Sequence, residues 1–298
     1  MHEINYSLNC RTDDSYLDRM NFLNEISILH DEAISFASGR PNSKYFNVND
    51  VVSKFIEYNT QLKVHGNDQA NEIGQYNKTK GIINNDIAKL LANDLNIVCQ
   101  AEDIIVTDGA QEGMVLLINA LFNSASDVLI VSDPTYIGFV GYAKICGINI
   151  VSVPREMDSV DLKLLEQTVK MLIQQGSNPK CFYEVPNYHN PTGEKMPQKK
   201  CLDLIDLAEK YNFLIIEDDP YGYFNYENRE LYTLKSLDKY NRVIYLGSFS
   251  KTIFPSIRIG FILADQKISC NEHSLNLIDV FYPLIVRIEQ RCNFCQGK

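Results

Sequence analysis

Short apolar runs alternate with longer amphipathic stretches from residue 101 to residue 263. The apolar runs predict strands at residues 104–106, 128–131, 148–153, 181–185, 213–216, 243–246 and 259–263. The stretches between them predict helices at residues 111–122, 136–145, 162–173 and 197–211. Strands that alternate with helices of this length indicate βαβ units and an α/β fold with a mostly parallel sheet. The strands are uninterrupted apolar runs, which is typical of a sheet covered by helices on both faces.

The composition of the 298-residue chain is that of an ordinary globular protein. Hydrophobic residues make up 45% and charged residues 22%, which excludes disordered and collagen-like classes. The 28 basic and 38 acidic residues give a formal charge of −10. That charge argues against a nucleic-acid partner, because phosphate backbones are bound by clustered cations. No apolar run is long enough to predict a membrane span, and the start lacks the apolar region of a signal peptide. The 8 cysteines are scattered, which favours reduced thiols and a cytoplasmic location.

The part of the chain before residue 101 carries weaker signals. Residues 1–35 are polar, and a short helix is predicted at residues 17–29. Gly39 and Pro41 predict a loop at residues 38–43, because glycine and proline interrupt regular structure. A helix is predicted at residues 49–61 and a surface loop at residues 71–81.

Polar segments follow five of the predicted strands. In parallel sheets ligands bind beyond the carboxyl ends of the strands, so these segments are expected to lie along one edge. They are residues 108–111, 133–136, 187–193, 218–221 and 248–251.

The last of these segments brings together two hydroxyls, an amine and a guanidinium. Ser248, Ser250 and Arg258 suit a phosphate dianion. Lys251 could instead form a Schiff base with a carbonyl compound. The alternative is a solvated loop with a surface lysine. A second phosphate signal is Gly109-Ala110-Gln111, which opens a predicted helix whose free N–H groups attract anions. A plain turn into a helix has the same pattern.

The remaining segments offer partners for an aromatic ring. A carboxylate at a buried strand end needs a partner because unpaired charge is costly there, and a protonated ring nitrogen would suit Asp218. Tyr136 offers a face for stacking, while Tyr221 and Asn190 are placed to meet a phenolate oxygen. A turn or a helix cap is the alternative for residues 218–221. Together these groups are the requirements of pyridoxal phosphate: a Schiff-base lysine, a carboxylate for the pyridinium nitrogen and an anchored phosphate.

Four stretches of sequence also match the motifs of a known family. They are Phe36-Ala37-Ser38-Gly39-Arg40-Pro41, Asn187 to Gly193 ending in Asn-Pro-Thr-Gly, Ile216-Glu217-Asp218-Asp219-Pro220-Tyr221, and Ser248 to Lys251 with Arg258-Ile259-Gly260-Phe261. In these the chain resembles the fold-type I pyridoxal-phosphate enzymes, specifically the class I/II aminotransferases and their aminoadipate/kynurenine branch. The resemblance covers roughly residues 30–265.

The resemblance implies three layers, with a mostly parallel sheet flanked by helices, and an incomplete small domain. The expected units are an N-terminal arm and small-domain segment at residues 1–60, the large cofactor-binding domain at residues 61–265, and a remnant of the C-terminal small domain at residues 266–298. Family members are usually homodimers with active sites at the interface, so a homodimer is expected.

The implied activity moves an amino group from an amino acid to a 2-oxo acid, with pyridoxal phosphate as cofactor. By the resemblance, Lys251 would form the Schiff base and then act as general base at the substrate carbon. Asp218 would hold the ring nitrogen protonated, and Tyr136 would stack on the ring. Tyr221 and Asn190 would bond the phenolic oxygen.

The resemblance also implies which groups bind the phosphate and the substrate. The phosphate ligands would be Gly109, Ala110, Gln111, Ser248, Ser250 and Arg258. Tyr76 matches a tyrosine that reaches the phosphate of the partner subunit. Gly39, with Asn190, would lie on the substrate side, and no metal is expected.

The sequence departs from the family in two places. Residue 110 is alanine where relatives often carry serine or threonine, so one side-chain phosphate contact is expected to be missing. The similarity fades after Asp265, although relatives continue into a segment whose arginine pairs with the substrate carboxylate. Arg287 and Arg291 lie in the tail, but no motif surrounds them and neither is assigned that role. A fragment, a frameshifted product and a degraded enzyme all fit this tail.

Other functions fit parts of the sequence. A decarboxylase or lyase would use the same cofactor motifs, and a truncated cofactor-binding protein would not turn over. The effector domain of a transcriptional regulator would need a basic DNA-binding module in front, and residues 1–35 are short and not basic. Cys292 and Cys295 have metal-ligand spacing, but a zinc site needs about four ligands and only His273 is near. His189 is expected at the surface or facing the substrate.

Overall fold

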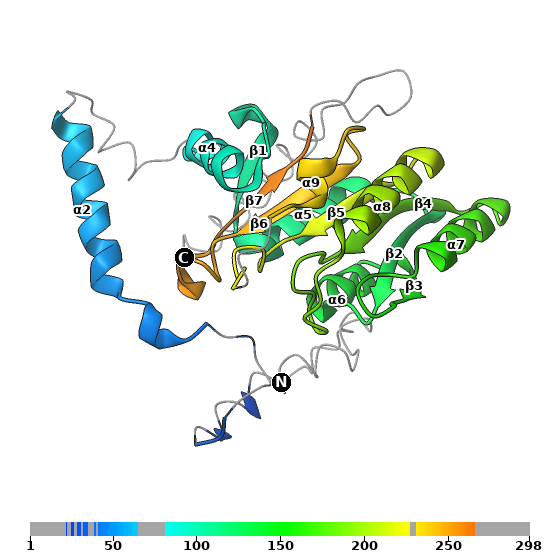
Figure 1. Cartoon of the computed structure of the whole chain (residues 1–298), viewed down its shortest axis with the longest axis horizontal. Helices are drawn as coiled ribbons and strands as arrows, with labels where there is room; N and C mark the ends of the chain where they lie inside the picture. The colour runs from blue at the N-terminus through cyan, green and yellow to red at the C-terminus, as the bar shows by residue number, and fades with distance from the viewer. Residues whose placement is uncertain are drawn as a thin grey trace, which may run out of the picture.

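The computed structural model describes residues 41–64, 81–226 and 231–265, together with single positions between residues 22 and 39. These residues form a sheet with helices on both faces (Figure 1), which confirms the predicted fold class. The helix expected at residues 17–29 falls largely outside the described residues. The loop expected at residues 71–81 lies outside them except for Gly81, and the tail from residue 266 lies wholly outside them.

The sheet has seven strands in the order β1-β7-β6-β5-β4-β2-β3. The strands are β1 (Ile104–Asp108), β2 (Asp127–Asp133), β3 (Asn149–Pro154), β4 (Asn178–Glu184), β5 (Leu214–Asp218), β6 (Val243–Ser248) and β7 (Ile259–Leu263). Neighbours from β3 to β6 pair in parallel, whereas β7 is antiparallel to both β6 and β1. Because β7 runs the opposite way, the residues just before it lie at the same edge as the carboxyl ends of the others.

Of the α-helices in the described part of the chain, two precede the first strand, and five others follow strands β1 to β5 in turn. They are α2 (Val48–Val64), α4 (Asn84–Leu95), α5 (Gly109–Leu121), α6 (Ile137–Ile145), α7 (Leu162–Gln174), α8 (Gln198–Tyr211) and the short α9 (Leu234–Leu237). The helices predicted at residues 111–122, 136–145, 162–173 and 197–211 correspond to α5 to α8, and the one predicted at residues 49–61 corresponds to α2.

The core lies in two layers, one on each face of the sheet. Successive strand residues alternate between them: Leu129 and Ile216 pack with α5 and α6, whereas Ile130 and Ile215 pack with α7 and α8. All four side chains are fully buried. This is why the strands read as continuous apolar runs in the sequence, since both faces of each strand are covered.

Helix α4 was not predicted. Its residues Ile87, Leu91 and Leu95 are buried against Tyr245 and Phe261 at the β1–β7 end of the sheet. The spacing of these three residues is four, which places them on one helical face. The sequence therefore contained the signal for this helix.

Helix α2 has apolar side chains that face solvent in the described structure. Val52, Phe55 and Ile56 are at least half exposed. Figure 1 shows α2, in blue, standing apart from the sheet. Within the described residues, nothing packs on this face of α2. None of the helices in the described part of the chain is long and apolar enough to cross a membrane.

Candidate functional site

The five polar segments meet at the carboxyl edge of the sheet, as predicted. Asp218 is the last residue of β5 and Ser248 the last of β6, and Lys251 lies in the turn after β6. Arg258 directly precedes β7 and reaches this edge because β7 is reversed. Its guanidinium Nη2 donates to the backbone carbonyl of Asp108, at the end of β1, over 3.1 Å.

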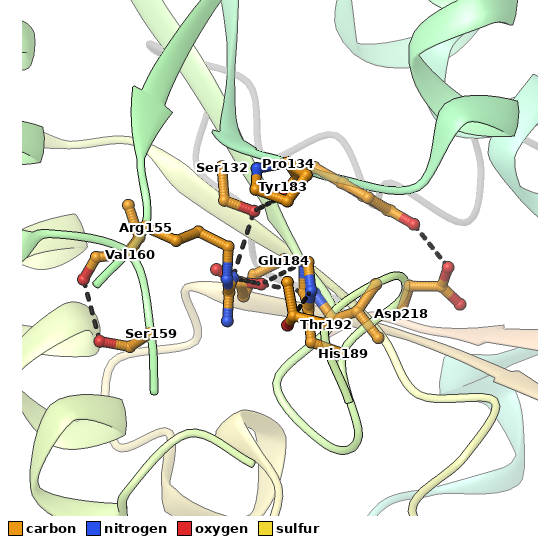
Figure 2. Close-up of polar contacts among 11 residues, drawn as sticks. Ser132, Pro134, Arg155, Ser159, Val160, Tyr183, Glu184, His189, Thr192 and Asp218 are labelled. Atoms are coloured by element: carbon orange, nitrogen blue, oxygen red, sulfur yellow. Dashed lines mark hydrogen bonds and ion pairs between the residues drawn. The ribbon is translucent and has the colours of Figure 1, made fainter. Parts of the chain in front are cut away.

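Asp218 has one bonded oxygen and one without a partner. The carboxylate is buried, with 3% exposure. The Tyr183 hydroxyl donates to Oδ2 over 2.6 Å (Figure 2), and Oδ1 has no hydrogen-bond partner within the described part of the chain. Burial raises the pKa of Asp218 to about 7, the Tyr183 bond opposes this rise, and the neighbouring Asp219 adds to it. A buried oxygen without a donor fits a ligand that brings a cationic N–H group.

Two tyrosines share this site with Asp218. The half-buried Tyr136 precedes α6, and burial raises the pKa of its phenol, while a bond with Gln111 lowers it and the Asp218 charge raises it. Burial also raises the pKa of Tyr221, and Asn190 opposes that rise by donating to the Tyr221 hydroxyl over 3.3 Å. Asp218 and Tyr136 are among the charges felt by Tyr221, so the groups predicted to surround an aromatic ring lie close together.

Lys251 is half-buried and presents an amine to the same edge. Its Nζ donates to the carbonyl of Gly39 over 2.9 Å, a contact between residues far apart in the sequence. Burial lowers the pKa of Lys251 below its ordinary value. A lowered pKa increases the fraction of neutral amine, which is the form that attacks a carbonyl carbon.

A cluster of groups that suit a phosphate, which we call the anion site, consists of Gly109, Ala110, Ser248, Ser250 and Arg258. The first turn of α5 has no side-chain cap from Asp108, so its N–H groups remain available. Gly109 has φ +70° and lies so close to the Arg258 guanidinium that a Cβ would not fit. Gly260 lies against the backbone of Gly109 and Ala110, where a Cβ would also collide. These two glycines bring the helix start, β7 and Arg258 together.

The hydroxyls of the anion site join Arg258. Its Nη1 donates to the Ser250 hydroxyl over 3.5 Å, and the Ser250 backbone N–H donates to Ser248 Oγ over 3.2 Å. The carboxylate of Asp108 lies 3.5 Å from Arg258 Nε. Arg258 itself has φ +52°, a left-handed conformation that is uncommon outside glycine.

The arrangement fits pyridoxal phosphate. It offers an amine, an unpartnered carboxylate oxygen, an aromatic face and a helix start with a guanidinium, which are the four groups that this cofactor requires. Ala110 contributes no hydroxyl, as expected from the sequence. Tyr76, Arg287, Arg291, Cys292 and Cys295 lie outside the described residues. Among the described side chains, no group of His, Cys, Asp and Glu is arranged to hold a metal ion.

Sequence reasoning misplaced or missed several residues around the site. His189 was expected at the surface or facing the substrate, but it is 1% exposed and packs beside Glu184 and Arg155. Tyr183 was read only as part of an apolar strand. Glu184 carried a signal that was not used, because a charged residue inside a buried strand requires a partner.

The comparison with known proteins settles the family. Residues 32–282 match the family described as aminotransferase class I and II. The chain belongs to this family. Pyridoxal phosphate is the cofactor of the family, and this confirms the predicted family and cofactor.

Several aminotransferases are similar to this family member. It is 37% identical to a (S)-3,5-dihydroxyphenylglycine transaminase of Amycolatopsis orientalis over 86% of this chain, and 29% identical to the mitochondrial kynurenine/alpha-aminoadipate aminotransferase of Rattus norvegicus over 80%. It spans 59% of the length of each. The solved multiple substrate aminotransferase of Thermococcus profundus superposes with a TM-score of 0.74 at 28% identity, over 91% of this chain and 63% of that one.

Regulatory proteins are also similar to the chain. A probable rhizopine catabolism regulatory protein, MocR, of Rhizobium meliloti is 28% identical over 80% of this chain and 45% of its own length. The aminotransferase fold is therefore shared by relatives named as enzymes and by relatives named as regulators.

Proposed function

We propose that this chain carries the large domain of an aminotransferase that moves an amino group from an amino acid to a 2-oxo acid, with Lys251 bonded covalently to pyridoxal phosphate. The observation that carries the proposal is the unpartnered Oδ1 of buried Asp218 at the same edge as the Lys251 amine. The chain spans 59% of the length of the (S)-3,5-dihydroxyphenylglycine transaminase and of the kynurenine/alpha-aminoadipate aminotransferase. The activity is therefore proposed for the protein to which these residues contribute.

Asp218 has the task of holding a proton on the cofactor's ring nitrogen. When bound, pyridoxal phosphate supplies an electron-withdrawing ring that stabilises negative charge at the substrate carbon. The free Oδ1 would accept the ring N–H, while the Tyr183 hydroxyl donates to Oδ2 and holds the carboxylate in place. A carboxylate paired with a cation ionises more readily, so the raised pKa of Asp218 falls once the site is filled.

Lys251 has two tasks. As a neutral amine it attaches the cofactor, which its lowered pKa favours. After an incoming amino acid has displaced it, the same amine would serve as the general base that takes the proton from the substrate Cα. The Gly39 carbonyl holds Nζ in position before the reaction.

The other site residues orient the reactants. Tyr136 would lie against one face of the ring, and Tyr221, to which Asn190 donates, would bind its phenolic oxygen. The anion site would hold the phosphate through the α5 N–H groups, the two serine hydroxyls and Arg258. Gly39, whose carbonyl accepts from Lys251, would lie on the substrate side.

Two measurements test this proposal. Borohydride reduction after mixing with pyridoxal phosphate, followed by peptide mapping, should place the added mass on Lys251, and Lys251→Ala should abolish it. Donor amino acids with 2-oxoglutarate should then give the new amino acid. Elimination or decarboxylation products without amino transfer would favour a lyase or decarboxylase. Covalent binding without any half-reaction would favour a cofactor-binding protein without turnover.

The proposal also covers the domain organisation, the oligomeric state and the cellular compartment of the protein. Residues 1–60 would form an arm and part of the small domain, residues 61–265 the large domain, and residues 266–298 a further piece of the small domain. Homodimer formation and a cytoplasmic location complete it. The four cysteines of the described part are free thiols, which supports a reducing compartment. Light scattering of the purified chain tests the dimer.

A further inference from the structure

A buried polar cluster lies behind the cofactor-facing residues. We call it the Glu184 network, and it consists of Ser132, Arg155, Glu184, His189 and Thr192 (Figure 2). These residues come from β2, the segment after β3, the end of β4 and the loop at residues 187–193. Neither the cofactor nor the substrate contact assigned above involves any of them.

The centre of the Glu184 network is a fully buried ion pair. Arg155 Nη1 lies 2.7 Å from Glu184 Oε1, and the two side chains are 4% and 0% exposed. Arg155 Nη1 also donates to the Ser132 hydroxyl over 3.3 Å. The Val185 backbone N–H donates to Glu184 Oε1 over 3.0 Å. A guanidinium and a carboxylate thus share one enclosed space.

His189 connects this ion pair to the loop. Its Nε2 lies 3.6 Å from Glu184 Oε1, and its Nδ1 is 2.9 Å from the Thr192 hydroxyl. Burial lowers the pKa of His189 to about 3, and the Arg155 charge acts in the same direction. The imidazole is therefore neutral, and it lies between the Glu184 carboxylate and the Thr192 hydroxyl.

The network touches the segments that carry two cofactor-facing residues. His189 immediately precedes Asn190, which bonds Tyr221. On the other side, Ser132 Oγ donates to the Pro134 carbonyl over 3.3 Å, and the Arg155 N–H donates to the Asp133 carbonyl over 3.2 Å. These two carbonyls lie in the short segment that leads from β2 to Tyr136.

A buried ion pair seldom stabilises a folded protein more than apolar side chains of the same volume would. An apolar pair of similar volume is often as stable, whereas removal of one partner leaves an uncompensated charge. The value of an ion pair is then its directional bonds, which fix several segments relative to one another. Arg155 bonds the end of β2 through Ser132 and Asp133 and the end of β4 through Glu184, and Glu184 lies beside His189 of the loop at residues 187–193.

We propose that Arg155 and Glu184 are positioning residues that hold Asn190 and Tyr136 in place for the cofactor, acting through His189 and Ser132. The inference rests on the proposed function, since it concerns the same cofactor. It adds residues that no cofactor-contacting motif contains.

The decisive variant replaces the pair by apolar residues, Arg155→Met together with Glu184→Leu. A positioning role predicts that the apo protein melts near the wild-type temperature while pyridoxal phosphate binds about tenfold more weakly, because small displacements of orienting groups are costly. The pH midpoint of the bound cofactor's absorbance change should also shift. Hydrogen exchange in the apo protein should become faster at the His189 and Gly193 amides, which bond within the loop, and remain unchanged in α8.

A control and a second variant keep the test decisive. Glu209→Gln breaks the Arg242–Glu209 pair at the opposite edge of the sheet and should alter none of these readouts. If the double variant does not fold, Thr192→Val, at an exposed position, should weaken cofactor binding about threefold. Wild-type affinity in whichever variant is folded would overturn the inference. Failure of the wild-type protein to bind at Lys251 would instead overturn the proposed function, and the inference with it.

Discussion

Asp218 is the residue whose ionisation the fold controls most directly. Burial raises its pKa from the ordinary 3.8 to about 7. Between these values the unfolded chain is ionised at this position while the folded apo protein retains the proton. The unfolded state therefore binds fewer protons, and the stability of the apo protein falls as the pH rises from about 4 to about 7.

Asp218→Asn should remove this pH-dependent loss. As the pH rises from 4 to 8, the unfolding free energy of the wild-type apo protein should fall relative to that of the apo variant by roughly 4 kcal/mol. This is the free energy that corresponds to about three pKa units. Its affinity for pyridoxal phosphate should fall, because a neutral amide does not balance the charge on the ring nitrogen. Denaturant unfolding at the two pH values and a cofactor titration measure both effects.

Tyr183→Phe provides the matched control for that experiment. It keeps the ring, which stacks on Phe139 at 4.2 Å between centroids, and removes the hydroxyl that donates to Asp218. Since that hydrogen bond lowers the pKa of Asp218, the pH at which apo stability falls should move upward. An unchanged midpoint would mean that Tyr183 does not influence the ionisation of Asp218.

Asp108 competes with a phosphate for Arg258. Its carboxylate lies 3.5 Å from Arg258 Nε and is largely exposed. Asp108→Asn removes a negative charge beside a dianion, and we expect pyridoxal phosphate to bind about threefold to tenfold more tightly at low salt. The affinity for pyridoxal, which lacks the phosphate, should not change. Equal gains for the two compounds would contradict an anion site at this position.

The residues found from sequence and those missed differ in how they act. Lys251 and Asp218 could be predicted because each lies at or just after the carboxyl end of a strand, where ligands bind in parallel sheets. Arg258 was predicted from its nearness to Ser248 and Ser250 in the sequence and from the family motif. Tyr183, Arg155 and Glu184 were missed because their roles depend on partners 35 and 29 positions away. Strand-end position does not reveal such pairs, since they exist only after the sheet has formed.

At the scale of elements, the contact between β7 and the first turn of α5 determines where the groups of the anion site lie. Gly260 of β7 lies against the backbone of Gly109 and Ala110. Gly260→Ala should push the first turn of α5 away, because a backbone cannot yield as a flexible side chain does. We expect a loss of about 1–3 kcal/mol in unfolding free energy and a reduced preference for pyridoxal phosphate over pyridoxal.

Gly113→Ala is the control for that change. Gly113 lies in the same helix, but an added Cβ would meet the side-chain ends of Leu246 and Ile262. It should destabilise the protein without altering the preference for the phosphorylated compound. Loss of that preference in both variants would show that α5 responds as a whole and that its first turn has no special role.

Element prediction succeeded where both faces of a strand are buried. All seven predicted strands exist, although each was predicted shorter or displaced by a few residues, except residues 259–263. The reversed direction of β7 could not be predicted, because an apolar run carries no information about direction. Helix α4 was not predicted, although Ile87, Leu91 and Leu95 have helical spacing. The signal was present in the sequence and was overlooked.

At the scale of the whole molecule, the expected dimer makes a complementation experiment possible. In the proposed dimer, Tyr76 would reach the phosphate of the partner subunit, whereas Lys251 would act within its own subunit. In a heterodimer of Lys251→Ala and Tyr76→Phe chains, one site carries both defects and the other carries neither. Co-refolding equal amounts should recover about a quarter of the wild-type sites, counted by borohydride labelling at Lys251. No recovery above the Tyr76→Phe protein alone would argue against a shared site.

The reversed strand has a consequence for the order of assembly. β7 separates β1 from β6 in the sheet, although it is the last of the seven to be synthesised. A growing chain on the ribosome therefore has a split sheet until residues 259–263 emerge and insert between the two edges. Arg258 arrives with that insertion, so the proposed anion site is complete only when the final strand lies between β1 and β6.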